Sequence, residues 1–134
     1  QWDLVMDRSE STIAKVWIWD NEGAGFGVPL SNYLGWFFTS WLFYQAFALY
    51  LRRDRVRRLR DIKPSRRLLL IAILFYVSAG LTHVVPWLIG DSSQVADAAG
   101  QVWQTDALRE TTVAVLLFTM VFTAMLAAFR LVKS

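Results

Sequence analysis

Three apolar runs, each about as long as a bilayer core is thick, dominate the sequence and limit the folds open to it. They are Tyr33–Leu51, Leu68–Ile89 and Thr111–Leu131. A helix needs roughly 20 apolar residues to cross a hydrocarbon core about 30 Å thick. In lipid the backbone must satisfy its own hydrogen bonds, which a helix does. The sequence therefore predicts an all-α integral membrane protein with three transmembrane helices.

The charged residues lie between these runs and are divided by sign. Residues 52–67 hold nine Arg or Lys and two Asp, a net charge of +7, whereas residues 1–32 and 90–110 each carry a net charge of −3. Because cytoplasmic loops are enriched in Lys and Arg, the basic loop and the C-terminus are expected in the cytoplasm. A short basic loop also suits anionic lipid, and without a recognition fold it is weak evidence for nucleic acid.

The predicted organisation follows from these boundaries. An extracytoplasmic interfacial segment with a glycine-rich turn (1–32) precedes a helix (33–51), the basic loop (52–67), a second helix (68–89), an extracytoplasmic loop (90–110) and a third helix (111–131). The expected location is the bacterial inner membrane. The chain begins with Gln and shows no cleavable signal pattern, so we expect it to be a fragment or processed form with an upstream part. It has no Cys, which excludes disulfides and thiolate metal sites.

The first candidate site is WDLVMD at residues 2–7. Asp3 and Asp7 are four residues apart, so on a helix they share one face. Paired carboxyl groups can exchange protons with a substrate if burial raises one pKa toward neutral. The alternative is two solvated charges at a helix end. The run RSESTIAK that follows is polar and predicts a solvated segment, which favours that alternative.

Aromatic residues and a turn follow. Trp17 and Trp19 flank Ile18 and are typical of an interfacial anchor, although indole faces can also stabilise a cation. In GFGVPLSNYLGW, residues 25–36, the glycines permit tight backbone and Pro29 suits the entry of a helix. Asn32 can cap that helix.

His83 is the only histidine and lies inside the second predicted span. An ionisable group within a membrane is a candidate functional residue. It could hydrogen-bond a neighbouring helix or ligate the metal of a bacteriochlorophyll, with Ala79 and Gly80 leaving room for a flat ligand. Packing between helices is the simpler interpretation. No cluster of metal ligands or nucleophile triad is present, so no metal is expected.

The order WDLVMD, Trp17-x-Trp19 and GVPLSNYLGW, followed by two more apolar runs, resembles the C-terminal half of a carotenoid biosynthesis membrane protein family. This family includes the CruF-type carotenoid 1′,2′-hydratases and the bisanhydrobacterioruberin hydratases. The resemblance is most specific over residues 27–36.

The resemblance implies an enzyme, a lyase that adds water to the terminal double bond of an acyclic carotenoid without a cofactor, with further membrane helices upstream. It implies that Asp3 and Asp7 are catalytic and that the substrate contacts Trp17, Trp19, Asn32 and Trp36. The expected partners are a carotenoid or other long polyene, membrane lipids and other membrane helices, with no nucleic acid.

Other functions remain open at this stage. The chain could be a non-catalytic transmembrane subunit of a photosynthetic pigment–protein complex, derived from that family and binding carotenoid or stabilising the assembly. A small transporter is disfavoured because the predicted spans hold almost no charge.

Overall fold

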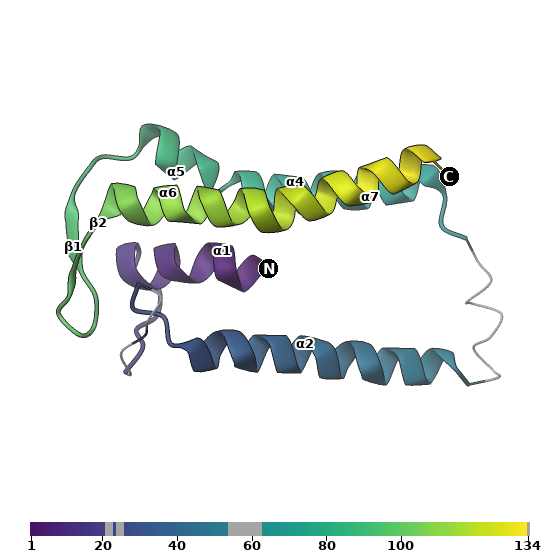
Figure 1. The fold of residues 1–134 in the computed structure, drawn as a ribbon, viewed down its shortest axis with the longest axis horizontal. Helices are drawn as coiled ribbons and strands as arrows, with labels where there is room; N and C mark the ends of the chain where they lie inside the picture. Colours follow the sequence, from purple (N-terminus) through teal and green to yellow (C-terminus); the bar gives the residue numbers. More distant parts are fainter. Residues whose placement is uncertain (21–22, 24–25, 54–62, 134) are drawn as a thin grey trace.

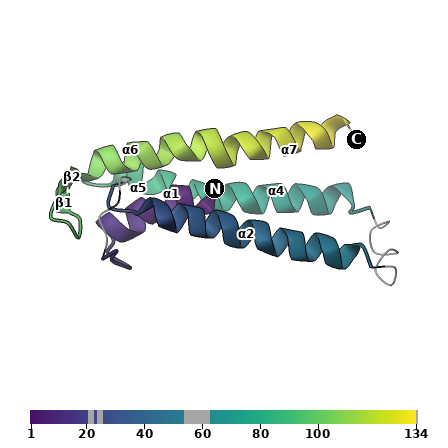
Figure 2. The same ribbon diagram turned by 60° about the horizontal axis from the view of Figure 1, so that its bottom comes forward.

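A computed structural model describes residues 1–20, 23, 26–53 and 63–133 and is mostly helical. Its elements, in chain order, are α1 (Trp2–Arg8), the π-helical turn η1 (Ser9–Ile13), α2 (Leu30–Leu51), α4 (Arg66–Leu81), α5 (Val84–Ile89), β1 (Gln94–Ala96), β2 (Val102–Gln104), α6 (Thr105–Leu116), η3 (Leu117–Val121) and α7 (Phe122–Lys133). Figures 1 and 2 show α4 beside α7 and the short helix α1 between α6 and the beginning of α2.

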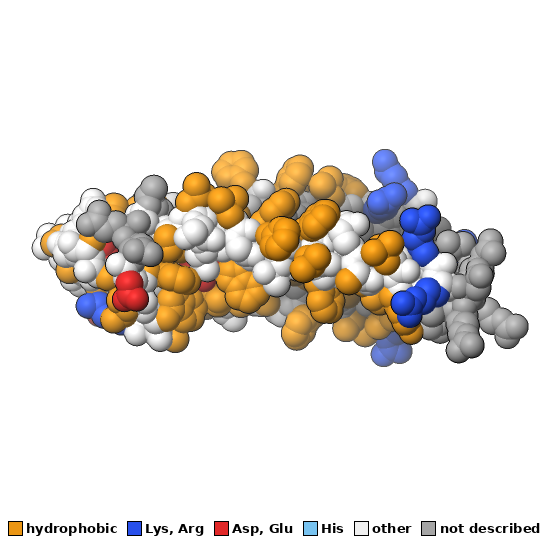
Figure 3. Space-filling model, turned by 90° about the horizontal axis from the view of Figure 1, so that it is seen from below, with side chains coloured by type: hydrophobic (Ala, Val, Ile, Leu, Met, Phe, Trp, Pro, Cys, Tyr) orange, Lys and Arg blue, Asp and Glu red, His pale blue; other side chains and the backbone are white. Residues whose placement is uncertain are grey.

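Two of the described helical stretches are long and apolar enough to cross a membrane. They are Arg66–Ile89, with 24 residues, and Thr105–Lys133, with 29, and each contains an 18-residue segment with a mean hydropathy of 2.3. The third expected span, α2, is helical over 22 residues but is less apolar by this measure and is not one of these two stretches. Apolar side chains cover the middle of the face in Figure 3, and Lys and Arg gather at one end. Membrane association follows from these helices together with the family relationship reported below, whereas a third span stays a prediction.

The predicted orientation depends on the basic loop at residues 52–67, and residues 54–62 lie outside the described part of the chain. Sidedness and inner-membrane location therefore also stay predictions.

The second predicted span is interrupted near its end. The helix stops at Leu81, turns through Thr82 and His83, and resumes as α5. Pro86 has no backbone N–H to donate to Thr82, which explains a break at this point. The break therefore lies one turn before the proline itself.

The predicted extracytoplasmic loop 90–110 contains regular structure. Strands β1 and β2 form an antiparallel hairpin in which Val95 pairs with Trp103. Within the hairpin turn, Asp97 accepts hydrogen bonds from the backbone N–H groups of Ala99 and Gln101 and from the Trp103 indole. The helix that follows begins at Thr105, six residues before the predicted start of the third span.

The core lies where α1 meets α4, α6 and η3. Val5, Leu116 and Met120 are buried together. A Cβ on Gly80 would lie 2.6 Å from Leu116 Cδ1, so the absence of a side chain there lets the helices approach. The space expected beside Ala79 and Gly80 for a flat ligand is thus occupied at Gly80 by Leu116 and Met120.

The described part of the glycine-rich turn docks between η1 and the hairpin. Phe26 and Gly27 both have positive φ angles, of 58° and 86°. The Thr12 hydroxyl donates a 2.7 Å hydrogen bond to the Phe26 carbonyl oxygen. A Cβ on Gly27 would lie 3.2 Å from both Asp97 Cβ and Thr12 Oγ1. The turn therefore fixes the start of α2 against the α1–η1 segment.

Gly27→Ala is expected to lower the free energy of unfolding by about 1–2 kcal/mol, because a left-handed backbone and a crowded Cβ both oppose it. Thermal unfolding in detergent measures the loss. Gly100→Ala is the matched control, since Gly100 has a φ of 80° and open space around a Cβ. An equal loss of stability in Gly27→Ala and Gly100→Ala would contradict the docking of the turn, because backbone strain alone would then explain both losses.

Candidate functional site

Two carboxyl groups of α1 meet one amide of α2. Asp3 and Asp7 lie one turn apart on α1, and Asn32 lies in the first turn of α2. The Asn32 amide nitrogen donates a hydrogen bond to Asp3 Oδ2 at 3.1 Å and another to Asp7 Oδ2. One amide thus holds both carboxyl groups together. These three sequence-predicted residues form one site.

Burial changes the acidity of this pair. Asp7 is only 2% exposed. Burial raises the pKa of Asp7 to about 6, the charge of Asp3 adds to the rise, and the Asn32 hydrogen bond opposes it. Burial also raises the pKa of Asp3. Asp7 can therefore give up or take a proton close to neutral pH, as a general acid or base requires.

The expectation of a solvated segment after Asp7 is wrong. Arg8, Ser11 and Thr12 are buried, because η1 continues α1 and packs beneath α6 and the hairpin. Ser9 bonds Thr112 of α6 through their hydroxyls at 3.2 Å, and Thr12 bonds the glycine-rich turn. Hydrogen bonds within the fold thus replace solvent around the hydroxyl groups of Ser9 and Thr12.

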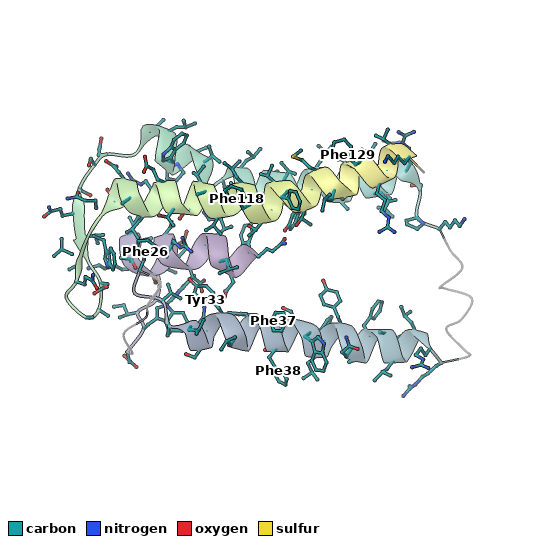
Figure 4. All side chains as sticks on the ribbon, in the orientation of Figure 1. Phe26, Tyr33, Phe37, Phe38, Phe118 and Phe129 are labelled. Atoms are coloured by element: carbon teal, nitrogen blue, oxygen red, sulfur yellow. The ribbon has the colours of Figure 1, made fainter. Side chains whose placement is uncertain are left out.

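Arg8 and Tyr33 belong to this neighbourhood and were not singled out from the sequence. The Arg8 guanidinium lies 5.3 Å from the centre of the Phe26 ring. Tyr33, next to Asn32 on α2, points toward α1 in Figure 4. The same figure shows Phe26 near the end of α1. The charges of Arg8, Asp7 and Asp3 all act on the Tyr33 hydroxyl. A single arginine in a polar run forms no sequence pattern that would have identified Arg8 as a residue of the site.

The three tryptophans predicted to bind substrate are not brought together with the carboxyl pair. Trp19 lines a separate cavity of about 60 Å³ beside Thr12 and Asp97, and Trp17 is half-buried. Trp36 lies on α2 with 55% of its surface exposed. Among the described residues, no hydrogen bond or ring contact joins any of the three to Asp3 or Asp7. Their role in substrate binding stays a prediction.

His83 lies at the break between α4 and α5 and packs against α1. Its ring centre is 5.5 Å from that of Trp2, in an edge-to-face arrangement. Its Nε2 atom is covered by protein and has no hydrogen-bond partner in the described part of the chain. One of the two atoms that could ligate a pigment metal is therefore closed off, and the packing does not fit a macrocycle there. Pigment binding at His83 stays a prediction, and nothing below depends on it.

An apolar groove of about 580 Å³ lies between α4 and α7. Its lining includes Leu69, Ala72, Ile73 and Tyr76 from α4 and Thr123, Ala124, Ala127, Arg130 and Leu131 from α7. Tyr76 and Thr123 are the lining residues farthest along their helices from the basic loop and the C-terminus. The Tyr76 hydroxyl donates to Gln1 Oε1, and Gln1 Nε2 donates to Thr123 Oγ1 at 2.9 Å. The groove therefore ends where α1 begins.

Asp7→Asn is expected to flatten the dependence of stability on pH. The folded wild type holds the Asp7 proton more tightly than the unfolded chain, with a pKa of about 6 against 3.8. Its free energy of unfolding should therefore fall as pH rises from about 4 to about 6, then level off, by up to about 3 kcal/mol. The variant cannot ionise and keeps an acceptor oxygen for Asn32.

Unfolding in detergent at about pH 4 and about pH 8 measures this difference, and Asp7→Asn should gain far more stability relative to wild type at the higher pH. Asp91→Asn, at an exposed aspartate, is the control. It should change the free energy of unfolding by the same amount at both pH values. An equal effect of Asp7→Asn at both pH values would contradict the raised pKa.

The amino-acid sequence of the chain also matches a known family. A family model described as carotenoid biosynthesis protein matches residues 1–96, which include α1, α2, α4 and α5. No curated protein and no solved structure matches the chain. Because the match covers well over half of the 134 residues, the chain belongs to the carotenoid biosynthesis protein family.

Proposed function

We propose that the chain is part of a carotenoid hydratase, which adds water to the terminal double bond of an acyclic carotenoid. Family membership supports a carotenoid-related role. The observation that carries the finer proposal is the buried Asp7 carboxyl group, held beside Asp3 by the single amide of Asn32. An isolated alkene is protonated only by a positioned acid, and a carboxyl group with a raised pKa supplies one.

The reaction balances with these two carboxyl groups. The protonated Asp7 gives its proton to the less substituted carbon of the double bond, which leaves a tertiary carbocation at the other carbon and the Asp7 carboxylate. The oxygen of a water molecule adds its electron pair to the cation and forms the new C–O bond. The proton that this oxygen then loses passes to a carboxylate of the pair, which restores the acid. The net change is the addition of one water molecule.

The α4–α7 groove is a suitable place for the body of a polyene. Its lining is mainly apolar, and it ends at Gln1. From Gln1 to Asp7 the helix rises roughly 9 Å, at about 1.5 Å per residue. A long apolar chain that leaves the groove along α1 would thus present its end near the carboxyl pair. An extended polyene has a length comparable to the bilayer, which suits this path.

Hydration is tested by incubating the chain, and the gene product that contains it, with an acyclic carotene in oxygen-labelled water. The expected product is a tertiary alcohol that carries the label. Asp7→Asn should lower the rate at least about 100-fold, the usual contribution of a general acid. Asp3→Asn should also lower it, and Asp91→Asn should not. Full activity of the Asp3 and Asp7 variants would rule out this assignment of the acid.

A second candidate function is a non-catalytic subunit of a pigment–protein complex. The observation that favours it is α2, which contains no buried residue and exposes Phe37, Phe43 and Tyr44 by 69–73%. Such a face suits lipid or a partner helix. Native membranes extracted in mild detergent distinguish the two functions. A 15.4 kDa chain that co-purifies with pigment proteins and forms no alcohol supports the subunit, whereas a longer chain that forms the alcohol supports the hydratase.

A further inference from the structure

Two of the three nitrogen atoms of the buried Arg8 guanidinium have no acceptor among the described residues. The residue is only 7% exposed, and its Nε and Nη1 atoms are covered and have no hydrogen-bond partner in the described part of the chain. One ring face, that of Phe26, lies 5.3 Å from it. A buried charge whose N–H groups find no acceptor is costly, and buried polar groups in proteins are otherwise almost all paired. The arrangement points to an acceptor that a ligand supplies.

A second donor lies close to the first. The Tyr33 hydroxyl is buried and has no hydrogen-bond partner among the described residues. The Arg8 side chain is close enough to act on this hydroxyl through its charge and as a nearby donor, and the charges of Asp7 and Asp3 act on it too. Tyr33 follows Asn32 directly in α2. Arg8 and Tyr33 therefore offer unpaired N–H and O–H groups next to the carboxyl pair, from two different helices.

The charge of the neighbourhood selects the kind of acceptor. Asp3 and Asp7 lie on the same short helix as Arg8, and an anion placed there would be repelled by the Asp3 carboxylate and by Asp7 whenever it is ionised. A neutral oxygen, in water, a hydroxyl or a carbonyl group, accepts hydrogen bonds without that repulsion. The site is thus suited to a neutral oxygen and unsuited to a phosphate or carboxylate.

We propose that Arg8 and Tyr33 bind the oxygen atom at the end of the polyene, first as the water that adds to the chain and then as the hydroxyl of the tertiary alcohol. This inference rests on the proposed function, because the carboxyl pair defines where the polyene ends. While the oxygen belongs to water, one of the two residues donates to one lone pair, which leaves the other lone pair to form the C–O bond. The alcohol oxygen, once it has lost its extra proton, has two lone pairs and accepts from both Arg8 and Tyr33. The proton released from the oxygen passes to a carboxylate of the pair.

Binding tests this inference without any need for turnover. The chain is reconstituted in lipid nanodiscs and titrated with an acyclic carotene and, separately, with its tertiary alcohol, with quenching of the tryptophan fluorescence as the signal. The wild type should bind the alcohol about tenfold more tightly than the hydrocarbon, as expected for a hydrogen bond to a charged group. Tyr33→Phe and Arg8→Met should each lower this ratio toward one.

Controls keep the outcome interpretable. Tyr44→Phe changes an exposed tyrosine of the same helix and should leave the ratio unchanged. If Arg8→Met does not fold, Tyr33→Phe alone decides, because it removes one hydroxyl and little volume. A ratio near one for the wild type would overturn the inference. So would loss of alcohol binding in inorganic phosphate at constant ionic strength, which would show an anion site instead.

The experiments distinguish failure of the oxygen site from failure of the hydratase proposal. If labelled oxygen is never incorporated but the alcohol is preferred and the preference depends on Tyr33, the oxygen site stands and the hydratase proposal falls. If the label is incorporated and the Asp7 variant is inactive, but the alcohol is not preferred, the hydratase proposal stands and the oxygen site falls.

Discussion

The insertion of α1 between α6 and α2 is the contact on which the rest of the structure depends. One face of this short helix places Val5 in the core with Leu116 and Met120. Another face presents Asp3 and Asp7 to Asn32, where α2 is joined to the remainder of the chain. Because α2 has no buried residue of its own, the amide–carboxyl contact both attaches α2 and creates the site. Stability and proton chemistry therefore share the same few atoms.

The helices were predictable because their signals are local. Apolar runs of membrane-spanning length gave α2, α4–α5 and α6–α7 with ends displaced by a few residues, and the i, i+4 spacing of Asp3 and Asp7 placed them on one face. Arg8 and Tyr33 could not be found in this way. Their burial depends on contacts between α1, α2 and the glycine-rich turn, which are distant in sequence and leave no periodic pattern. The same reason explains the error over the polar run after Asp7, where tertiary hydrogen bonds replaced water.

The family relationship and the geometry contribute different parts of the functional account. Membership in the carotenoid biosynthesis protein family indicates a carotenoid-related function. The structure gives an acid with a raised pKa, a second carboxyl group beside it, an apolar groove that ends at the same helix, and two unpaired donors. Each of these elements matches one need of alkene hydration: a proton, a base, room for the chain and a place for the oxygen.

The central claim is that Asp7 exchanges its proton near pH 6, and infrared spectroscopy tests it directly. The carbonyl stretch of a protonated carboxyl group is recorded from the chain in membranes while the pH is varied. The account predicts a band that disappears with a midpoint near pH 6, as the pKa of about 6 requires, and that is absent from the Asp7→Asn variant. A midpoint near 3.8, the ordinary value for aspartate, would mean that Asp7 is ionised throughout the neutral range and cannot be the acid.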